Sequence, residues 1–495
     1  MCIHLPRVPP PACSAVRFPY TAGNSGGDTH HLNIAAASVV RHISERFAMS
    51  TPERSPISST EASTTDNTAP SRREFLKSSS LVAAGAVAGS LSVARSAHAA
   101  GSDVLKIGLI GCGGRGTGAA VQALKADPNV RLIALGDVFP DALASSLANL
   151  KKTKEADRVD VPADRQFTGF DNYKKVCDSG IDVVLLATPP QFRPEHMEYA
   201  VKAGLHTFVE KPVAVDALGV HRVLAAGEEA KKKNLAVVSG LCWRYDFGAR
   251  AAMQQIQDGA IGDICAIHAQ YNTPGLPKWP MLKRESGWSD MEFQLRNWYY
   301  YTWLSGDGIV EQAVHSVDKA GWAMKDEAPI SCMSLGGLAS RIAPERGNIF
   351  DHHSVVYEYA GGVRVFFNCC QIEGVSGDVS TYVMGSKANC LVERPTVTDR
   401  KGETLWRYRG PKNTMHQTEH DELFAGLRSG NIINNTEFMA RSTMLGIIGR
   451  MASYTAKKIT WEQAMNSQEN LTPAAFEWGP LPTPAVAIPG VTKFV

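Results

Sequence analysis

The fold of this chain is decided by Val104-Leu105-Lys106-Ile107-Gly108-Leu109-Ile110-Gly111-Cys112-Gly113-Gly114-Arg115-Gly116, a mostly apolar run that ends in a G-x-G-x-x-G motif. The apolar run predicts a buried strand, and the Ala-rich segment 117–126 predicts a helix. Gly111 permits a tight turn, Gly113 lets the backbone approach a pyrophosphate, and Gly116 lets the helix pack close to the strand. We therefore predict a strand, a phosphate-binding loop and a helix, with Gly111, Gly113, Gly114, Arg115 and Gly116 contacting a dinucleotide.

A second apolar run, residues 130–135, ends near Asp137, which lies 21 residues beyond Gly116. An acidic residue at this distance is expected to hold the hydroxyls of the adenosine ribose. The next residues are Val138 and Phe139, so no cation follows that could accept a 2′-phosphate. The spacing therefore predicts NAD rather than NADP as the cofactor.

Strands and helices alternate through the rest of this region. Strands are expected at 182–187, 206–209 and 236–240, with helices at about 194–203 and 217–233. Such alternation predicts a doubly wound parallel sheet, here a Rossmann domain spanning 103–240. Ligands of such sheets bind at the carboxyl ends of the strands. Further cofactor contacts are therefore expected at the residues that follow these strands: Thr188, Pro189, Glu210 and Lys211. His196, within the helix expected at 194–203, is a further cofactor candidate, and the alternative is that it pairs with the backbone.

Composition limits the function further. The chain has 495 residues, 44% of them hydrophobic, and a formal net charge of +2. This balance gives no support for a nucleic-acid surface. Ten cysteines without a CxxC motif argue against a disulfide framework and a thiolate zinc site, and favour buried, reduced thiols.

The first 99 residues are expected to lie outside the enzyme, as a leader, a disordered segment (51–70) and a signal peptide. The signal begins at Ser71-Arg72-Arg73-Glu74-Phe75-Leu76-Lys77, continues through a short apolar stretch, and ends at Ala97-His98-Ala99. This order resembles a twin-arginine export signal, which predicts a periplasmic or otherwise exported protein without a stable transmembrane span. An amphipathic helix or an uncleaved anchor is the alternative. Met49 precedes the signal, so 1–48 is read as a misplaced start or a long leader.

The turn Glu210-Lys211-Pro212 makes a family resemblance recognisable. Together with the glycine loop and Ala187-Thr188-Pro189-Pro190, it resembles the Gfo/Idh/MocA oxidoreductases over residues 104–465. Trp243-Arg244-Tyr245 looks like the family's arginine–aromatic turn, and residues 306–318 look like its G-G-G-x-x-x-D-x-G-x-H-x-x-D segment. The resemblance implies NAD-dependent oxidation of a secondary hydroxyl of a sugar or cyclitol.

The resemblance also implies a catalytic set of Lys211, Glu311 and His315. A neutral histidine can take the hydroxyl proton near pH 7, and an ammonium stabilises the developing alkoxide. Glu311 and His315 are four residues apart, so they would share one face of a helix. Glu311 replaces the family's Asp, Ala313 replaces a Gly, and Asp307 stands between the two remaining glycines, which leaves the substrate and the net reaction open.

Substrate contacts are expected from residues around this set: Trp243, Arg244, Tyr245, Tyr301, Asp318 and His420. Tyr301 belongs to an aromatic run, 298–303, which is either a sugar-stacking wall or core packing. Asp318 either binds hydroxyls or caps a turn. The pattern His416-Gln417-Thr418-Glu419-His420 matches a zinc-protease motif. Such a site needs a third ligand and a metalloprotease scaffold, whereas this pattern lies in the second domain of an apparent nucleotide enzyme, so we expect no metal.

The second domain, 241–465, is expected to be α/β with a broad antiparallel sheet, including strands at 354–359, 363–370, 380–384 and 389–393. A late helix, about 438–456, is expected to be mostly apolar on one face. Residues 466–495 are expected to be an extended tail. By resemblance, the sheet covers the substrate pocket and forms dimer or tetramer contacts.

Three functions remain open from the sequence. The first is a dehydrogenase that releases NADH. An exported enzyme meets no large free NAD pool, which favours tightly held NAD and an internal redox cycle, either sugar–sugar oxidoreduction or glycoside hydrolysis by oxidation, elimination, hydration and reduction. The hydrolase needs an extra base, for which Tyr299, Tyr300, Tyr301 or His420 are candidates. The third function is a non-catalytic sugar-binding relative, against which Lys211 and His315 argue.

Overall fold

A computed structural model describes residues 103–276, 280–343 and 346–495 of the chain. All of these residues belong to one compact unit, Ser71–Val495. The predicted leader and signal peptide, 1–99, lie outside the described residues, so they stay predictions.

The first half of the described chain forms a six-stranded parallel sheet in the order β3-β2-β1-β4-β5-β6. Its strands are β1 (Leu105–Ile110), β2 (Val130–Asp137), β3 (Gln166–Thr168), β4 (Val183–Leu186), β5 (His206–Val209) and β6 (Val237–Ser239). The strand order reverses between β1 and β4, which is where doubly wound sheets bind dinucleotides. The predicted Rossmann sheet is therefore confirmed.

Helices cover both faces of this sheet. One face carries α2 (Gly114–Ala126), α3 (Pro140–Leu150) and, from much later in the chain, α12 (Met415–Ser429). The other face carries α4 (Asn172–Cys177), α5 (Arg193–Lys202) and α6 (Ala217–Lys232). The strands between them are apolar on both faces, as expected for a parallel sheet covered on both sides.

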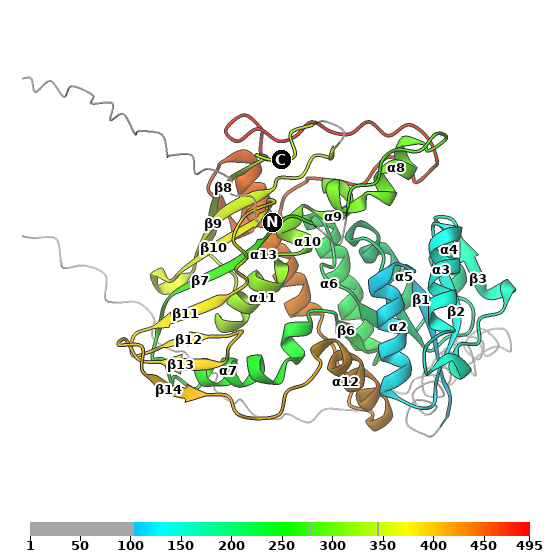
Figure 1. Cartoon of the computed structure of the whole chain (residues 1–495), viewed down its shortest axis with the longest axis horizontal. Coiled ribbons are helices and arrows are strands. Elements are labelled where there is room, and N and C mark those ends of the chain that lie inside the picture. Colours follow the sequence, from blue (N-terminus) through cyan, green and yellow to red (C-terminus); the bar gives the residue numbers. More distant parts are fainter. Residues whose placement is uncertain (1–102, 277–279, 344–345) are drawn as a thin grey trace, which may run out of the picture. The chain divides into compact units, whose positions relative to one another are not determined.

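The second sheet has nine strands, in the order β14-β13-β12-β11-β7-β10-β9-β8-β15 (Figure 1). Its pairs are antiparallel except for β7 with β10. Its strands are β7 (Ile264–Thr273), β8 (Ser331–Gly337), β9 (His352–Glu358), β10 (Arg364–Gln371), β11 (Thr381–Gly385), β12 (Asn389–Leu391), β13 (Thr396–Thr398), β14 (Thr404–Arg407) and β15 (Ile459–Thr460).

Helices α11 (Val314–Ala323) and α13 (Thr436–Thr455) lie between the two sheets in Figure 1. The sequence suggested one apolar face for the late helix, but α13 is buried on nearly all sides, including the fully buried Arg450. It packs against α6, α11, β8 and β9, so small and polar residues such as Gly449 and Ser442 are buried too. A helix enclosed in this way needs no polar face.

The remaining helices are short or peripheral: α7 (Phe247–Gln257), α8 (Asp290–Arg296), α9 (Thr302–Ser305), α10 (Gly308–Glu311) and α14 (Trp461–Met465). After α14, residues 466–495 contain no helix or strand. The eight cysteines that the structure describes are all free, and six of them are buried. Within the described ranges, no helix combines the length and hydropathy that crossing a bilayer requires.

Candidate active site

The glycine loop joins β1 to α2 at the carboxyl edge of the parallel sheet. Gly111 has φ +95°, and a Cβ there would lie 2.6 Å from the Ala187 carbonyl carbon. A Cβ at Gly116 would lie 1.9 Å from the Gly111 oxygen, so helix and strand touch through glycine. At Gly113 and Gly114 a Cβ would meet nothing within 4 Å. The loop is thus tight where it packs and open where α2 begins, which fits a pyrophosphate beside the helix N-terminus.

Asp137 ends β2 beside this loop. Its Oδ2 accepts a hydrogen bond from the Cys112 amide at 2.6 Å, and its Oδ1 accepts one from the Phe139 amide at 2.9 Å. Burial raises the pKa of this carboxyl, and the two amides offset only part of that rise. The carboxylate therefore lies at the adenosine end of the predicted site, where ribose hydroxyls would be held.

Lys211 lies just beyond β5 and reaches across to α10. Its Nζ donates to the Glu311 backbone oxygen at 2.7 Å, to Glu311 Oε1 at 3.2 Å and to Gln312 Oε1 at 3.5 Å. The other carboxylate oxygen of Glu311, Oε2, is buried and has no hydrogen-bond partner among the described residues. The turn after β5 and the second domain thus meet at this ammonium group.

His315 lies near Lys211, at the first turn of α11. Burial lowers the pKa of His315 well below its ordinary 6.5, and the charges of Lys211, Lys319, His416 and Arg115 lower it further. Its buried Nδ1 has no hydrogen-bond partner in the described part of the chain. A neutral imidazole near an ammonium group is suited to accept a proton from a hydroxyl.

Glu311 and His315 do not share one helix, as their spacing suggested. Helix α10 ends at Glu311 and α11 begins at Val314. Between them one helical turn is wider than in an α-helix, because the Ala313 amide donates to the Gly308 oxygen, five residues back, at 3.0 Å. The two residues therefore lie on either side of a break between helices, and i, i+4 spacing does not describe their geometry.

Arg115 connects the glycine loop to the lysine turn. It forms ion pairs with Glu210 and, at 2.6 Å, with Glu419 of α12. Burial raises the pKa of Glu210, but Arg115, Arg193 and Lys211 hold it below its usual value. Burial raises the pKa of Glu419 to about 7 despite His416 and Arg115. The network joins the predicted phosphate loop, the predicted catalytic turn and α12 through one guanidinium group.

Thr188 and Pro189 follow β4, facing the same edge of the sheet. The Thr188 hydroxyl lies 3.4 Å from Nδ1 of His196, whose ring stacks on Tyr173 at 4.3 Å. Burial and Arg193 lower the pKa of His196 to about 3. His196 is thus a buried support beneath the Thr188 loop, which differs from the expected contact with the cofactor.

Arg244, Tyr245 and Asp318 also lie elsewhere than expected. The fully buried Asp318 accepts from Arg244 Nη2 at 2.8 Å and from the Ser442 hydroxyl at 2.6 Å. Arg244 pairs with Asp326 as well, and the Tyr245 hydroxyl donates to Asn435. The polar atoms of these three side chains are bonded to other residues of the protein. They therefore hold the domain together, which differs from the expected contact with substrate.

Trp243 is the member of this turn that lies toward the site. The Lys319 ammonium lies 4.2 Å from its ring centroid and pairs with Glu393 at 2.5 Å. Lys319 is fully buried, and its charge is one of those that act on His315. Trp243 thus neighbours the Lys211–His315 group through a buried cation.

Tyr301 and His420 are both buried. Tyr301 lines a cavity of about 730 Å³ together with Arg284, Arg341 and Tyr300, and none of the predicted catalytic residues lines it. The aromatic run to which Tyr301 belongs is mostly core packing, since Tyr299, Tyr300, Tyr301 and Trp303 are all buried. His420 is fully buried, with its ring 4.2 Å from that of Phe208. Neither position matches the expected substrate contact.

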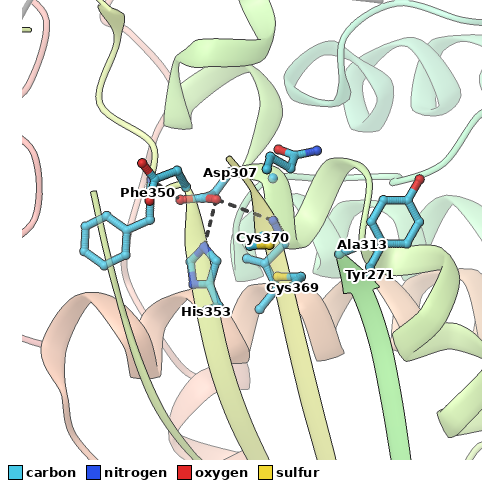
Figure 2. A pocket seen from close by; sticks show the side chains of 11 residues that line it. Tyr271, Asp307, Ala313, Phe350, His353, Cys369 and Cys370 are labelled. Atoms are coloured by element: carbon cyan, nitrogen blue, oxygen red, sulfur yellow. Dashed lines mark hydrogen bonds and ion pairs between the residues drawn. The ribbon is translucent and has the colours of Figure 1, made fainter. Parts of the chain in front are cut away.

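The sequence did not reveal the supports of α10. Asp307 precedes this helix, and its buried carboxylate accepts from His353 Nε2 at 3.0 Å, the Phe350 amide at 2.9 Å and the Tyr454 hydroxyl at 2.6 Å. Figure 2 shows Asp307 and His353 facing each other beside a small cavity that Tyr271 and Ala313 also line. Gln312, the third acceptor for Lys211, was also missed, although its place next to Glu311 was a usable signal.

Comparison with known proteins agrees with the two-domain fold described above. Residues 105–239 match the model of the oxidoreductase family with an NAD-binding Rossmann fold, and residues 249–390 match the Gfo/Idh/MocA C-terminal domain. Inositol 2-dehydrogenase of Rhizobium meliloti (strain 1021) is 24% identical over 324 residues, covering 65% of this chain and 86% of that protein.

Two further relatives are informative. Glycosyl hydrolase family 109 protein 1 of Bacteroides fragilis is 27% identical over 171 residues, covering 34% of this chain and 35% of that protein. The structure of levoglucosan dehydrogenase in complex with NADH and levoglucosan has a TM-score of 0.56, with 18% identity and coverage of 72% and 99%. At that identity the likeness shows the shared fold alone. The two family matches together span more than half of the 495 residues, and the chain therefore belongs to the Gfo/Idh/MocA family of NAD-binding oxidoreductases.

Proposed function

We propose that this protein oxidises a secondary hydroxyl of a sugar, glycoside or cyclitol, with Lys211 and His315 as its catalytic residues and Glu311 holding Lys211. The observation that carries the proposal is the meeting of the Lys211 ammonium with Glu311 and with a neutral His315, beyond the carboxyl end of β5. The similarity to an inositol 2-dehydrogenase supports this class of substrate.

The proton is handled by this chain's own residues. As the C–H bond breaks and the carbonyl forms, the hydroxyl must lose its proton, and the neutral His315 imidazole accepts it. The Lys211 ammonium stabilises the negative charge that develops on the oxygen. Glu311 and Gln312 fix Lys211 by accepting its hydrogen bonds, so the ammonium is in place before substrate binds. Bound NAD supplies the acceptor for the hydride.

A second candidate is a hydrolase that begins with the same oxidation and ends by reducing the sugar again. Its support is the similarity to a family 109 glycosyl hydrolase over 171 residues. The bases that we considered for its second step, Tyr299, Tyr300, Tyr301 and His420, are all buried in this structure. Two half-exposed side chains lie closer to the site. His416 contributes to the lowered pKa of His315, and Glu311 contributes to the raised pKa of Tyr271.

We also propose export by the twin-arginine route, supported by Arg72-Arg73 and the Ala97-His98-Ala99 pattern. This route carries folded proteins, so NAD could travel in its site. Tightly held NAD would then favour an internal cycle over release of NADH. Replacing Arg72 and Arg73 by lysine should keep the protein in the cytoplasmic fraction, and unchanged export of that variant would argue against this route.

The first experiment uses protein that begins at Ala100. We would denature it, assay the released nucleotide, and then offer sugars, cyclitols and glycosides to the native protein while following absorbance at 340 nm and the product. Steady NADH formation from added NAD indicates a dehydrogenase. A new ketone or a released aglycone without net NADH indicates the internal cycle. No nucleotide in the protein and no NAD binding on titration would contradict the proposal.

The Lys211→Met variant tests the catalytic set. It should lower kcat about 10²- to 10⁴-fold, because it removes the charge that stabilises the alkoxide, while NADH still binds. Lys125→Met, which removes an exposed lysine of α2, is the matched control and should leave kcat unchanged. Full activity of Lys211→Met would remove Lys211 from the mechanism.

A further inference from the structure

The C-terminal tail crosses the carboxyl edge of the parallel sheet. The Leu471 amide donates to Asp216 Oδ2 at 3.0 Å, at the start of α6, beyond β5. Gln191 Nε2, in the loop after β4, donates to the Thr472 hydroxyl at 2.7 Å. This is the edge at which the glycine loop and Lys211 lie. The tail therefore borders the predicted cofactor site, although nothing in its sequence resembles a nucleotide-binding motif.

Two tail aromatics lie against the loops that follow three of the strands. Phe476 lies 5.2 Å from Phe192, after β4, and 6.0 Å from Phe170, after β3. Trp478 lies 4.9 Å from Phe170 and 5.8 Å from Phe139, which is two residues beyond Asp137. The loops after β2 and β4 border the adenosine half of a dinucleotide in such sheets. The aromatic contacts thus border the solvent side of the place where the adenosine half of the dinucleotide is expected.

The second domain holds the tail from its other side. The Met291 amide of α8 donates to the Gly479 oxygen at 3.2 Å, and Gln294 Nε2 donates to the Leu481 oxygen at 2.6 Å. Arg296, at the end of α8, lies 4.0 Å from the Phe139 ring centroid and pairs with Asp141 at 3.0 Å. Helix α8 and the tail therefore meet the adenosine end together, and the red tail passes α8 in Figure 1.

The attachment of the tail is suited to opening. Residues 466–495 contain no helix or strand, so side-chain contacts and single hydrogen bonds hold them. Trp478 is 50% exposed although it contacts two rings. Segments with few buried contacts and little regular structure open at a lower free-energy cost than the core. By contrast, the far end of the tail is tied back, since the Val495 oxygen accepts from Ser467 at 2.6 Å and the Gly490 amide donates to the Thr455 oxygen at 3.1 Å.

We propose that residues 471–481 are a strap that retains the nucleotide, with Phe476 and Trp478 as the residues that keep it closed over the adenosine end of the site. The strap must open for NAD to leave. The proposal rests on the NAD-binding part of the function above and is independent of which hydroxyl compound is oxidised. By linkage, bound nucleotide must stabilise the closed strap by as much as the strap stabilises bound nucleotide.

The rate of NADH release measures the strap directly. Protein loaded with NADH is mixed with excess NAD, and the loss of NADH fluorescence gives the dissociation rate. Trp478→Ala and Phe476→Ala should each raise this rate by at least roughly two- to tenfold, the range expected for loss of one aromatic pair, because each side chain contacts more than one ring. Trp478→Phe should restore most of the retention. Phe494→Ala, which removes a tail aromatic that packs on the main core, is the matched control and should leave the rate unchanged.

A second readout follows the strap itself. Bound NADH should slow hydrogen exchange of the amides in 471–481 in the wild-type protein, and this protection should shrink in Trp478→Ala. The proposal would be overturned if NADH dissociated no faster from both alanine variants than from the wild-type protein. It would also be overturned if NADH left the hydrogen exchange of the 471–481 amides unchanged. Neither readout needs a substrate, so failure of the strap is distinguishable from failure to oxidise sugars, and a protein that binds no NADH at all fails at the proposed function instead.

Discussion

His315 is held neutral by its surroundings. Burial is the largest cause of its lowered pKa, followed by the positive charges of Lys211 and Lys319. A lowered pKa keeps the base form populated as pH falls, so kcat/KM should stay level through pH 6.5 and decline only at lower pH. A pH–rate profile checks this. In Lys211→Met, the pKa of His315 measured by NMR should rise, and it should not change in Lys125→Met. An acid limb at or above pH 6.5 would contradict this assignment.

Asp318 is expected to act on stability and not on substrate affinity. Its buried carboxylate accepts hydrogen bonds from Arg244 and Ser442. Asp318→Asn therefore removes a negative charge that offsets the positive charge of the buried Arg244 guanidinium. Breaking a buried pair in this way costs about 3–5 kcal/mol, which urea unfolding would detect. Glu198→Gln, which breaks the more exposed pair with Arg222, is the control and should cost at most about 1 kcal/mol. A stable Asp318→Asn protein with a raised KM would restore the substrate role.

Chemical logic predicted some site residues better than others. Lys211 contacts Glu311, and the glycine loop joins β1 to α2 as expected, because strand ends and glycine spacing fix the backbone positions that carry them. Arg244 and Asp318 were misplaced, because the sequence does not record which charge pairs with which. Their partners, Asp326 and Ser442, lie 82 and 124 residues away from them in the chain.

At the scale of elements, the short helix α10 depends on Asp307. This residue has φ +89° and ψ 160°, a conformation that is nearly exclusive to glycine and costs a side chain about 1–3 kcal/mol. Burial raises the pKa of Asp307, but His353 and Tyr454 hold it below its usual value. The stabilisation from this lowered pKa is therefore present above the ordinary pKa of 3.8 and is lost as pH falls through the folded value.

Two substitutions separate the strain at position 307 from the hydrogen bonds. Both Asp307→Gly and Asp307→Ala lose the carboxylate, but only alanine keeps the strained backbone. Asp307→Ala should therefore be less stable than Asp307→Gly by about 1–3 kcal/mol in urea unfolding. At the exposed Asp263, whose φ is not positive, glycine should be no better than alanine. Equal stabilities of the two variants at 307 would show that the backbone there is relaxed.

Elements were predictable where their pattern is local. The predicted strand at 206–209 coincides with β5, and the one at 389–393 contains all of β12, since apolar residues and flanking turns mark them. Strand β7 was not predicted, although it lies in the middle of the nine-stranded sheet. Its partners β10 and β11 lie about 100 residues later, and its half-buried residues alternate weakly. Long-range pairing of this kind leaves little signal in the strand itself.

At the scale of the whole molecule, segments late in the chain complete the Rossmann domain. Leu423 and Phe424 of α12 belong to the apolar core on one face of the parallel sheet, and the tail borders its carboxyl edge. The sequence indicated two consecutive domains, because apolar periodicity reports burial but not the surface against which a helix is buried. The nucleotide site is therefore built from three parts of the chain, and truncation before α12 would expose the core that this helix covers.

The outer face of the nine-stranded sheet should join copies of this chain. Met333, Val356 and Phe366 lie in one row across β8, β9 and β10, on the face opposite the buried Tyr357 and Phe367. Met333 and Leu335 are 55% and 66% exposed, and a contiguous apolar surface of this kind is typical of an interface. We therefore expect a dimer or tetramer.

Leu335→Lys should shift this assembly toward monomer in sedimentation velocity, because association would bury the new charge. Ile488→Lys, at a comparably exposed tail position, should leave the assembly intact. A wild-type monomer, or an assembly indifferent to Leu335→Lys, would place any interface on another face.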